Sequence, residues 1–443
     1  MKKRQKYTWG IVGIVCVMFL AVTYYALRVV QRNNHLNNVG QSIDYLMTGD
    51  FKNSKDTEGE FEYQSQIYNY LVTSNSENKK TVSRAIATTV GYQSLSTQEE
   101  KTCYNLIKSN CNKISNTSNK PGSYPIETIT VRNCKLSPYQ IKKILYAVQN
   151  DNPDIFWIAS NFSYQYDVGG NTILKLNSIL SPKDQKSAIK HLSEKVASIL
   201  SKVSPNASDY EKELYVHDYI VKNCKYTYNK NNPKIYTSYG CLIEKAAVCE
   251  GYAKATQLLL NTLGIECSTV TGAKGNEPHM WNIVKIKKQW YHLDVTWDGS
   301  SAIGRYNYFN LDDKTIKKDH KINAQINPSD KLSDQRYNFK LPKCSSMTEN
   351  YYTKNAVKLS KLDNNSENAI IKELVRMASK KLKYLYLKIT SNYKDIKNQL
   401  LSQKKIFKYF KSANNKAKNK INTSKLNYTE NKPQSVLILE ASY

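Results

Sequence analysis

The sequence predicts an α+β protein in which a buried helix packs on an antiparallel sheet, with small α+β flanking domains and one N-terminal transmembrane helix. The first observation is an apolar helical stretch, AAVCEGYAKATQLLL at 246–260, in a helix that ends before Gly264. The second is a change of period after this glycine, where β-rich segments follow, separated by Gly, Pro or paired lysines. The third is an uncharged apolar run near the start of the chain. Helices followed by an antiparallel sheet are typical of the α+β class.

The apolar run predicts a membrane anchor. Gly10–Leu27 (GIVGIVCVMFLAVTYYAL) carries no charge, and a basic segment, MKKRQKYTW, precedes it. A cleaved signal peptide starts in the same way, but no small-x-small cleavage site follows this run. Because basic flanks stay on the cytoplasmic side, we expect a cytoplasmic N-terminus (1–8), an uncleaved single-pass anchor in the cell membrane (9–30) and an extracellular remainder.

The basic charge does not by itself predict a nucleic-acid partner. The chain has a net charge of +28, yet only eight of its 65 basic residues are arginine, the side chain that contacts phosphates and bases in a bidentate manner. We expect a solvated basic surface and no nucleic-acid binding, with attraction to an anionic wall polymer or lipid headgroup left open. The nine cysteines show no CxxC pair, which argues against a zinc cluster or a disulfide scaffold, and no motif predicts a metal or a cofactor.

Two segments lie between the predicted anchor and the central domain, and the second is predicted to contain more regular secondary structure than the first. Residues 31–121 are rich in Asn, Ser, Thr, Lys and Gln and predict a polar, partly helical stalk. Residues 122–182 predict a small α+β domain, with a strand in ETITVRN, a helix after the cap Ser137, and a hairpin that turns at Gly169-Gly170.

The predicted central domain, 183–345, begins with two helical patterns at 185–202 and 208–223. The buried helix near Cys249 comes next, and IECSTVTG, HMWNIVKI and QWYHLDVTW follow as strands. The last segment, 346–443, has the order helix, strand, helix, strand and predicts a separate small α/β domain. Its predicted helices are 367–380 and 393–413.

Cys249 is the first candidate for chemistry. A lone cysteine is most often a small buried apolar residue, whereas a nucleophile needs a base, a positive local potential and a partner for the oxyanion. Cys249 begins a helix that is apolar on most sides, so the first turn lies inside the protein, where unpaired N–H groups and the helix dipole favour a thiolate. Gly251 in the same turn lets a substrate or a neighbouring chain approach closely.

His279 and Asp294 are the candidates for the base and for the group that orients it. If the paired lysines form a two-residue hairpin loop, Trp281 pairs with Asp294. Alternation then puts His279 on the same face, one diagonal step from this carboxylate. His292 would have its neighbours elsewhere, and His320 lies in a lysine-rich loop, where a structural or solvated imidazole is expected.

These motifs resemble a known family. Cys249 in VCEGYA, His279 in HMWNIV and Asp294 in YHLDVTWD match, in order and spacing, the core of the transglutaminase-like superfamily, which is similar in fold to papain-type cysteine proteases. The resemblance covers about 208–312, including YFNLDD, and implies a papain/transglutaminase-like core with a Cys-His-Asp catalytic triad. Met280 departs from the family, whose members usually carry a small residue after the histidine; a larger side chain here would narrow the site.

Together these residues predict thiol-dependent acyl transfer on amide bonds of a protein or a cell-wall peptide. Cys249 attacks the carbonyl and a thioester forms, with Tyr239 in SYGCLIEKAAVC as the candidate for the second oxyanion donor. Water then gives a peptidase or amidase and an amine gives a cross-link, and the sequence leaves both open. The alternative is a transglutaminase-like binding or scaffold module at the cell surface whose chemistry is unused.

Overall fold

The computed structural model describes residues 89–229, 231–301, 303–322 and 339–443. The described residues form two compact units, the smaller containing 110–135 and 157–182 and the larger containing the rest. None of the helices in these ranges is both long enough and apolar enough to cross a bilayer. The predicted anchor, 9–30, lies outside the described residues.

The smaller unit is built on a four-stranded antiparallel sheet. Its strands are β1 (Tyr124–Pro125), β2 (Ile129–Val131), β3 (Ile158–Tyr166) and β4 (Thr172–Ser178), and the first three all pair with β4. The predicted hairpin of β3 and β4 is confirmed. In its turn the Asn171 N–H donates to Asp167 Oδ1 at 2.9 Å, and Gly170 has a φ of 76°, which favours glycine.

The larger unit mixes helices and sheets, which confirms the α+β class. Its first elements are α4 (Val90–Gln93), α5 (Gln98–Asn110), α6 (Pro138–Asp151), α7 (Pro182–Leu200), α8 (Asp209–Asn223), β5 (Lys225–Tyr226), η1 (Pro233–Tyr236), the π-helix η2 (Gly240–Glu244), β6 (Ala246–Ala247) and α9 (Cys249–Thr262). Then come β7 (Cys267–Lys274), β8 (Glu277–Ile286), β9 (Gln289–Leu293), α10 (Val295–Ser300), α11 (Asp313–Ile316) and β10 (His320–Ile322).

Residues 89–121, part of the predicted polar and partly helical stalk, contain the helices α4 and α5. The carboxylate of Asp151, at the end of α6, accepts from the N–H groups of Gly91 and Tyr92 at 2.8 Å each, so α4 is attached to α6 by a buried polar contact. Because this contact is made by hydrogen bonds, it leaves no apolar periodicity in the sequence from which the packing of α4 on α6 could be predicted. α6 also belongs to the larger unit, which differs from the predicted domain 122–182 that included it.

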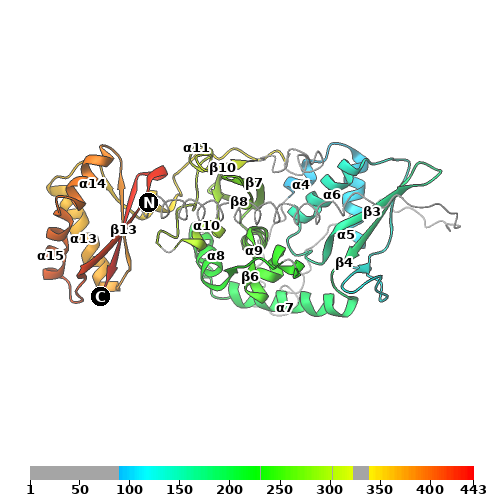
Figure 1. Cartoon of the computed structure of the whole chain (residues 1–443), viewed down its shortest axis with the longest axis horizontal. Helices are drawn as coiled ribbons and strands as arrows, with labels where there is room; N and C mark the ends of the chain where they lie inside the picture. The colour runs from blue at the N-terminus through cyan, green and yellow to red at the C-terminus, as the bar shows by residue number, and fades with distance from the viewer. Residues whose placement is uncertain (1–88, 230, 302, 323–338) are drawn as a thin grey trace, which may run out of the picture. The chain divides into compact units, whose positions relative to one another are not determined.

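The helix that begins at Cys249 lies against β7 and β8 (Figure 1), in a sheet of order β10-β7-β8-β9. The predicted register of the β8–β9 hairpin is confirmed, because Ile286 faces Gln289 across a two-residue loop. Lys287 and Lys288 have φ values of 48° and 65°, as a type I′ turn requires. β9 ends at Leu293, so the next residue, Asp294, leaves the sheet and caps α10.

Gly251 allows the segment before α9 to approach the helix closely. A Cβ at this position would lie 2.5 Å from Ile235 O and 2.8 Å from Ala247 Cβ. The same carbonyl of Ile235 accepts from the Val248 N–H at 3.1 Å, which positions the residue before Cys249. Two roles are predicted for Gly251, the close approach of a substrate or of a neighbouring stretch of chain. The structure shows the second, with residues 235 and 247 of the same chain.

Replacing Gly251 by alanine is expected to lower the free energy of unfolding by about 1–3 kcal/mol, because the added methyl group meets backbone that cannot move without shifting the start of α9. Urea unfolding measures the change. Gly299→Ala is the matched control, since a Cβ there would meet nothing closer than 3.8 Å. Equal losses in the two variants would contradict the prediction.

The C-terminal segment has its own sheet, of order β11-β12-β14-β13. Its elements are α12 (Tyr351–Asn355), β11 (Val357–Leu359), α13 (Asn364–Lys380), β12 (Tyr384–Ile389), α14 (Tyr393–Leu401), α15 (Lys405–Lys416), β13 (Asn422–Asn431), η4 (Lys432–Gln434) and β14 (Val436–Ser442). The prediction of a single helix at 393–413 is wrong. The helix is interrupted between α14 and α15, where Lys404 has a φ of 57°. The segment is part of the larger unit, and Asn307 Oδ1 accepts from Asn431 Nδ2 at 2.8 Å.

Candidate active site

Cys249 is the first residue of α9 and carries a free, half-buried thiol. The helix begins after Val248, whose side chain offers no cap. The N–H groups of the first turn have no partner within the helix, so they are available as donors to the oxyanion that forms on a carbonyl oxygen when the sulfur attacks the carbonyl carbon. The positive end of the helix dipole lies at the same place and favours a thiolate.

His279 is hydrogen-bonded to a carboxylate and is near enough to Cys249 for this thiol to affect the pKa of the imidazole. Its Nε2 lies 2.7 Å from Asp294 Oδ2, which leaves Nδ1 as the ring nitrogen available to Cys249. Burial acts to lower the pKa of His279, but the charge and hydrogen bond of Asp294, together with Cys249, raise this pKa to about 10. The imidazole is therefore held as the cation that a neighbouring thiolate needs.

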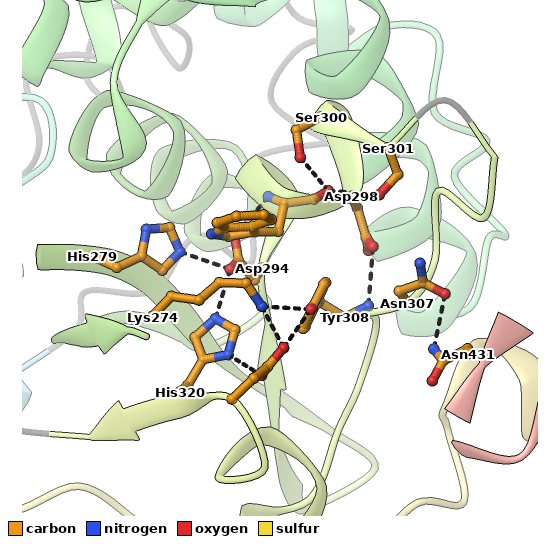
Figure 2. A network of polar contacts seen from close by, with 12 residues as sticks. Lys274, His279, Asp294, Asp298, Ser300, Ser301, Asn307, Tyr308, His320 and Asn431 are labelled. Atoms are coloured by element: carbon orange, nitrogen blue, oxygen red, sulfur yellow. Dashed lines mark hydrogen bonds and ion pairs between the residues drawn. The ribbon is translucent and has the colours of Figure 1, made fainter. Parts of the chain in front are cut away.

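Asp294 is fully buried and accepts hydrogen bonds on both oxygens. Oδ1 accepts from the Trp297 N–H at 3.1 Å, which caps α10. Oδ2 accepts from two imidazoles, His279 at 2.7 Å and His320 at 3.0 Å, and Figure 2 shows both rings pointing at this carboxylate. Burial acts to raise the pKa of Asp294, but the two imidazoles hold this pKa well below its usual value, so the carboxylate is ionised at neutral pH.

The position of His320 beside Asp294 does not follow from the sequence pattern. The residue begins β10, is 2% exposed and reaches Asp294 across 26 residues of sequence. Its other ring nitrogen, Nδ1, lies 2.7 Å from Asp319 Oδ1. The pairing of β10 with β7 brings this imidazole to the site, and a three-residue strand has too little periodicity to be predicted from sequence.

Tyr239, the predicted second oxyanion donor, lies directly before η2. Its ring stacks on Phe156 at a centroid distance of 5.1 Å, and Lys234 Nζ lies 5.4 Å from the ring centroid. These contacts orient the ring and do not test the role of the hydroxyl. Its role as an oxyanion donor stays a prediction.

Two groups of described side chains are close enough together to hold a metal ion: His279, Asp294 and His320, and His292, Asp313 and Cys344. In the first group the Nε2 atoms of His279 and His320 both donate to the carboxylate, so neither of these atoms has a lone pair to offer a metal ion. In the second, the Trp281 indole donates to His292 Nδ1 at 3.0 Å, so His292 Nε2 carries the proton that it donates to Asp313 at 2.9 Å. Burial lowers the pKa of His292, in agreement with this neutral ring. The hydrogen bonds therefore favour proton-bearing rings over metal ligands.

A second buried network holds α10 one turn further along the helix. His217 on α8 lies 3.2 Å from Asp298 Oδ2, and the Tyr308 N–H donates to Asp298 Oδ1 at 3.0 Å. Asp298 is four residues after Asp294, one turn along the same short helix. Contacts at two successive turns thus position the helix whose cap is the candidate carboxylate.

The buried carboxyl group of Glu213, on α8, is expected to make the free energy of unfolding depend on pH. Asn310 Nδ2 donates to Glu213 Oε2 at 2.7 Å, while Oε1 has no hydrogen-bond partner in the described part of the chain. Burial raises the pKa of Glu213 to about 8, so the folded protein keeps a proton that the unfolded chain releases above about pH 4.3. Between these values the contribution of Glu213 to the free energy of unfolding falls as pH rises, by up to ~1.4 kcal/mol per pH unit.

Glu213→Gln is expected to flatten this pH dependence, because glutamine matches the shape of the protonated side chain and does not titrate. Urea unfolding between about pH 5 and pH 8 measures the slope. Glu194→Gln, at a side chain that is 48% exposed, should leave the slope unchanged. A Glu213→Gln slope equal to that of the wild type would contradict the prediction.

Comparison with known proteins defines the class. Residues 197–295 match the sequence profile of the transglutaminase-like superfamily, and this range includes Cys249, His279 and Asp294. The chain therefore contains a transglutaminase-like domain.

Two solved structures show weaker similarity. A TGase is 16% identical, with 31% of this chain and 44% of that chain covered and a TM-score of 0.21. A protein from Cytophaga hutchinsonii, whose name provisionally calls it a cysteine protease, is 13% identical, with 41% and 70% covered and a TM-score of 0.21. The chain thus spans less than half the length of the TGase. No curated protein matches the sequence.

Proposed function

We propose that this protein is a surface-anchored enzyme that transfers acyl groups from amide bonds of proteins or cell-wall peptides. The observation that supports this most is the 2.7 Å hydrogen bond between His279 Nε2 and Asp294 Oδ2, which leaves the other ring nitrogen available to Cys249 at the start of α9. A buried charged pair costs desolvation free energy, and a module that only bound peptides would have no use for it.

In the proposed mechanism the Cys249 thiolate attacks the amide carbonyl carbon and forms a C–S bond. The carbonyl oxygen becomes an oxyanion that accepts hydrogen bonds from the Cys249 N–H and from Tyr239. His279 donates its Nδ1 proton to the amine, the C–N bond breaks, and a thioester remains. Water or a primary amine, deprotonated by His279, then releases a carboxylic acid or a new amide.

The location of the enzyme is part of the proposal. The uncharged run at 10–27 would anchor the chain in the cell membrane, with the basic N-terminus in the cytoplasm. The catalytic domain would then face the outside of the cell and meet surface proteins and wall peptides. The scarcity of arginine supports these substrates over nucleic acid.

Mass spectrometry of a peptide library incubated with the purified protein and a primary amine tests the function. Shortened or deamidated peptides mean hydrolysis, and an amine adduct means transfer. Cys249→Ala should abolish either product, whereas Cys344→Ala, at a buried thiol, should not. A library left unchanged by the wild-type protein would favour the binding or scaffold alternative.

A further inference from the structure

One oxygen atom connects two histidines in the candidate active site. Asp294 Oδ2 accepts from His279 at 2.7 Å and from His320 at 3.0 Å, and the two ring centroids lie 5.5 Å apart. A Cys-His-Asp mechanism uses only the first of these imidazoles. The second is buried, charged groups surround it, and the mechanism above assigns it no role.

Both ring nitrogens of His320 face carboxylates. Nε2 faces Asp294 and Nδ1 faces Asp319, 2.7 Å away. An ionised carboxylate only accepts hydrogen bonds, so both nitrogens donate and the ring carries a positive charge. Burial acts to raise the pKa of Asp319, but His320 and Lys274 hold this pKa well below its usual value, in agreement with an ionised acceptor.

Charges of opposite sign alternate along a series of side chains that begins at His279. The order is His279, Asp294, His320, Asp319 and Lys274, with Tyr308 donating to Asp319 at 2.6 Å (Figure 2 labels His279, Asp294, His320, Lys274 and Tyr308). Each charge has a neighbour of opposite sign, which offsets the cost of burying Asp294.

We propose that His320 is a positioning residue of the active site: its imidazolium fixes the carboxylate of Asp294 for His279 and sets the pH range over which the Cys249–His279 pair works. The inference rests on the proposed function, because it assigns the carboxylate to that mechanism. A cation on the far side of Asp294 offsets part of the carboxylate's charge. It therefore lowers the basicity of the thiolate and imidazole beyond it.

The groups that face the His320 ring come from several elements. The described titratable or charged groups that contact the ring are Asp294 after β9, His279 on β8, Tyr308 in the loop after α10 and Asp319 before β10. Lys274 on β7 acts through Asp319, and His292 on β9 interacts with the charge of His320. Of these groups only His279 also donates to Asp294 Oδ2, and it already does so in the wild-type protein, so none replaces the charge that His320 places on this oxygen.

Two neutral substitutions separate the charge from the hydrogen bonds. In His320→Gln the amide nitrogen falls near the place of Nε2 and keeps a donor on Asp294, whereas in His320→Asn it falls near Nδ1 and keeps the donor on Asp319. The experiment measures the rate of Cys249 alkylation by iodoacetamide from pH 4 to 10 in the full chain. His292→Gln is the matched control, because His292 is also buried on the same sheet and has Trp281 and Asp313 as its partners.

Both variants at position 320 are expected to move the midpoint of the pH profile upward by at least about half a pH unit, because a positive charge is lost. His320→Asn should also lower the plateau rate more than His320→Gln, since it leaves Asp294 without the second donor. A role in folding alone would lower stability without moving the midpoint.

Wild-type midpoints in both His320 variants would overturn the inference and leave the proposed function intact. If one variant fails to fold, the midpoint of the other decides in the same way. If neither folds, Lys274→Gln replaces them: an upward midpoint supports the inference and an unchanged one overturns it. Wild-type Cys249 that reacts no faster than a free thiol would instead overturn the proposed function, and the inference with it.

Discussion

Replacing Asp294 by asparagine is expected to slow both peptide turnover and the alkylation of Cys249, on the order of 10²–10⁴-fold. Asp294 Oδ2 accepts from two imidazole N–H groups, while Oδ1 accepts from the Trp297 N–H. An amide has one acceptor and one donor, so its NH₂ group must face at least one of these donors. If the NH₂ group faces His279, the ring must turn its lone pair to Nε2 and its proton to Nδ1, which can then no longer take a proton from the thiol.

Asp312→Asn is the matched control for this substitution. Asp312 caps α11 through the Thr315 N–H at 2.7 Å, as Asp294 caps α10, and asparagine caps a helix as well as aspartate does. The control therefore keeps the capping role and lacks the two imidazoles. We also expect Asp294→Asn to lower the free energy of unfolding by about 3–5 kcal/mol, measured by urea unfolding, because it leaves buried cations without their partner. Alkylation rates within twofold of the control would contradict the role of Asp294.

Replacing His279 by alanine is expected to remove the special reactivity of Cys249. At pH 7 the wild-type thiol should react with iodoacetamide ahead of the other cysteines, because the imidazolium stabilises its thiolate. An ordinary thiol is only about 3% thiolate at this pH, so the variant should react about 30-fold more slowly. Peptide mapping by mass spectrometry gives the rate for each cysteine.

The control for exposure is N-acetylcysteine, since Cys249 is half-buried and burial alone changes its rate. His191→Ala, at an exposed histidine on α7, controls for the loss of an imidazole elsewhere. A His279→Ala variant that still alkylates at the wild-type rate would mean that the thiol is not activated by this histidine.

Local patterns were sufficient for a large part of the site. The paired lysines and the period-two alternation predicted the hairpin register, and this register brings His279 and Asp294 together. The start of α9 followed from its apolar sides, and the helix cap at Ser137 followed from residue type. In each case the determining interaction lies within a few residues, or across one tight turn, so a short window of sequence contains it.

Other features depended on segments far apart in the chain. His320 has no motif, because its place beside Asp294 comes from a three-residue strand added to the edge of the sheet. Asp151 likewise joins α6 to α4 by hydrogen bonds to residues that lie 60 and 59 positions earlier in the sequence. The break between α14 and α15 was missed as well, since the apolar periodicity continues through a turn made by Lys404.

The sequence by itself therefore determined the α+β class, the hairpin and the three side chains that we propose for catalysis. Only the tertiary structure decided that the proposed catalytic carboxylate has a second imidazole and that this imidazole lies between two carboxylates. The physical reason is that periodicity records which face of a helix or strand is buried. Which distant side chain neutralises a buried charge is decided when the elements pack together.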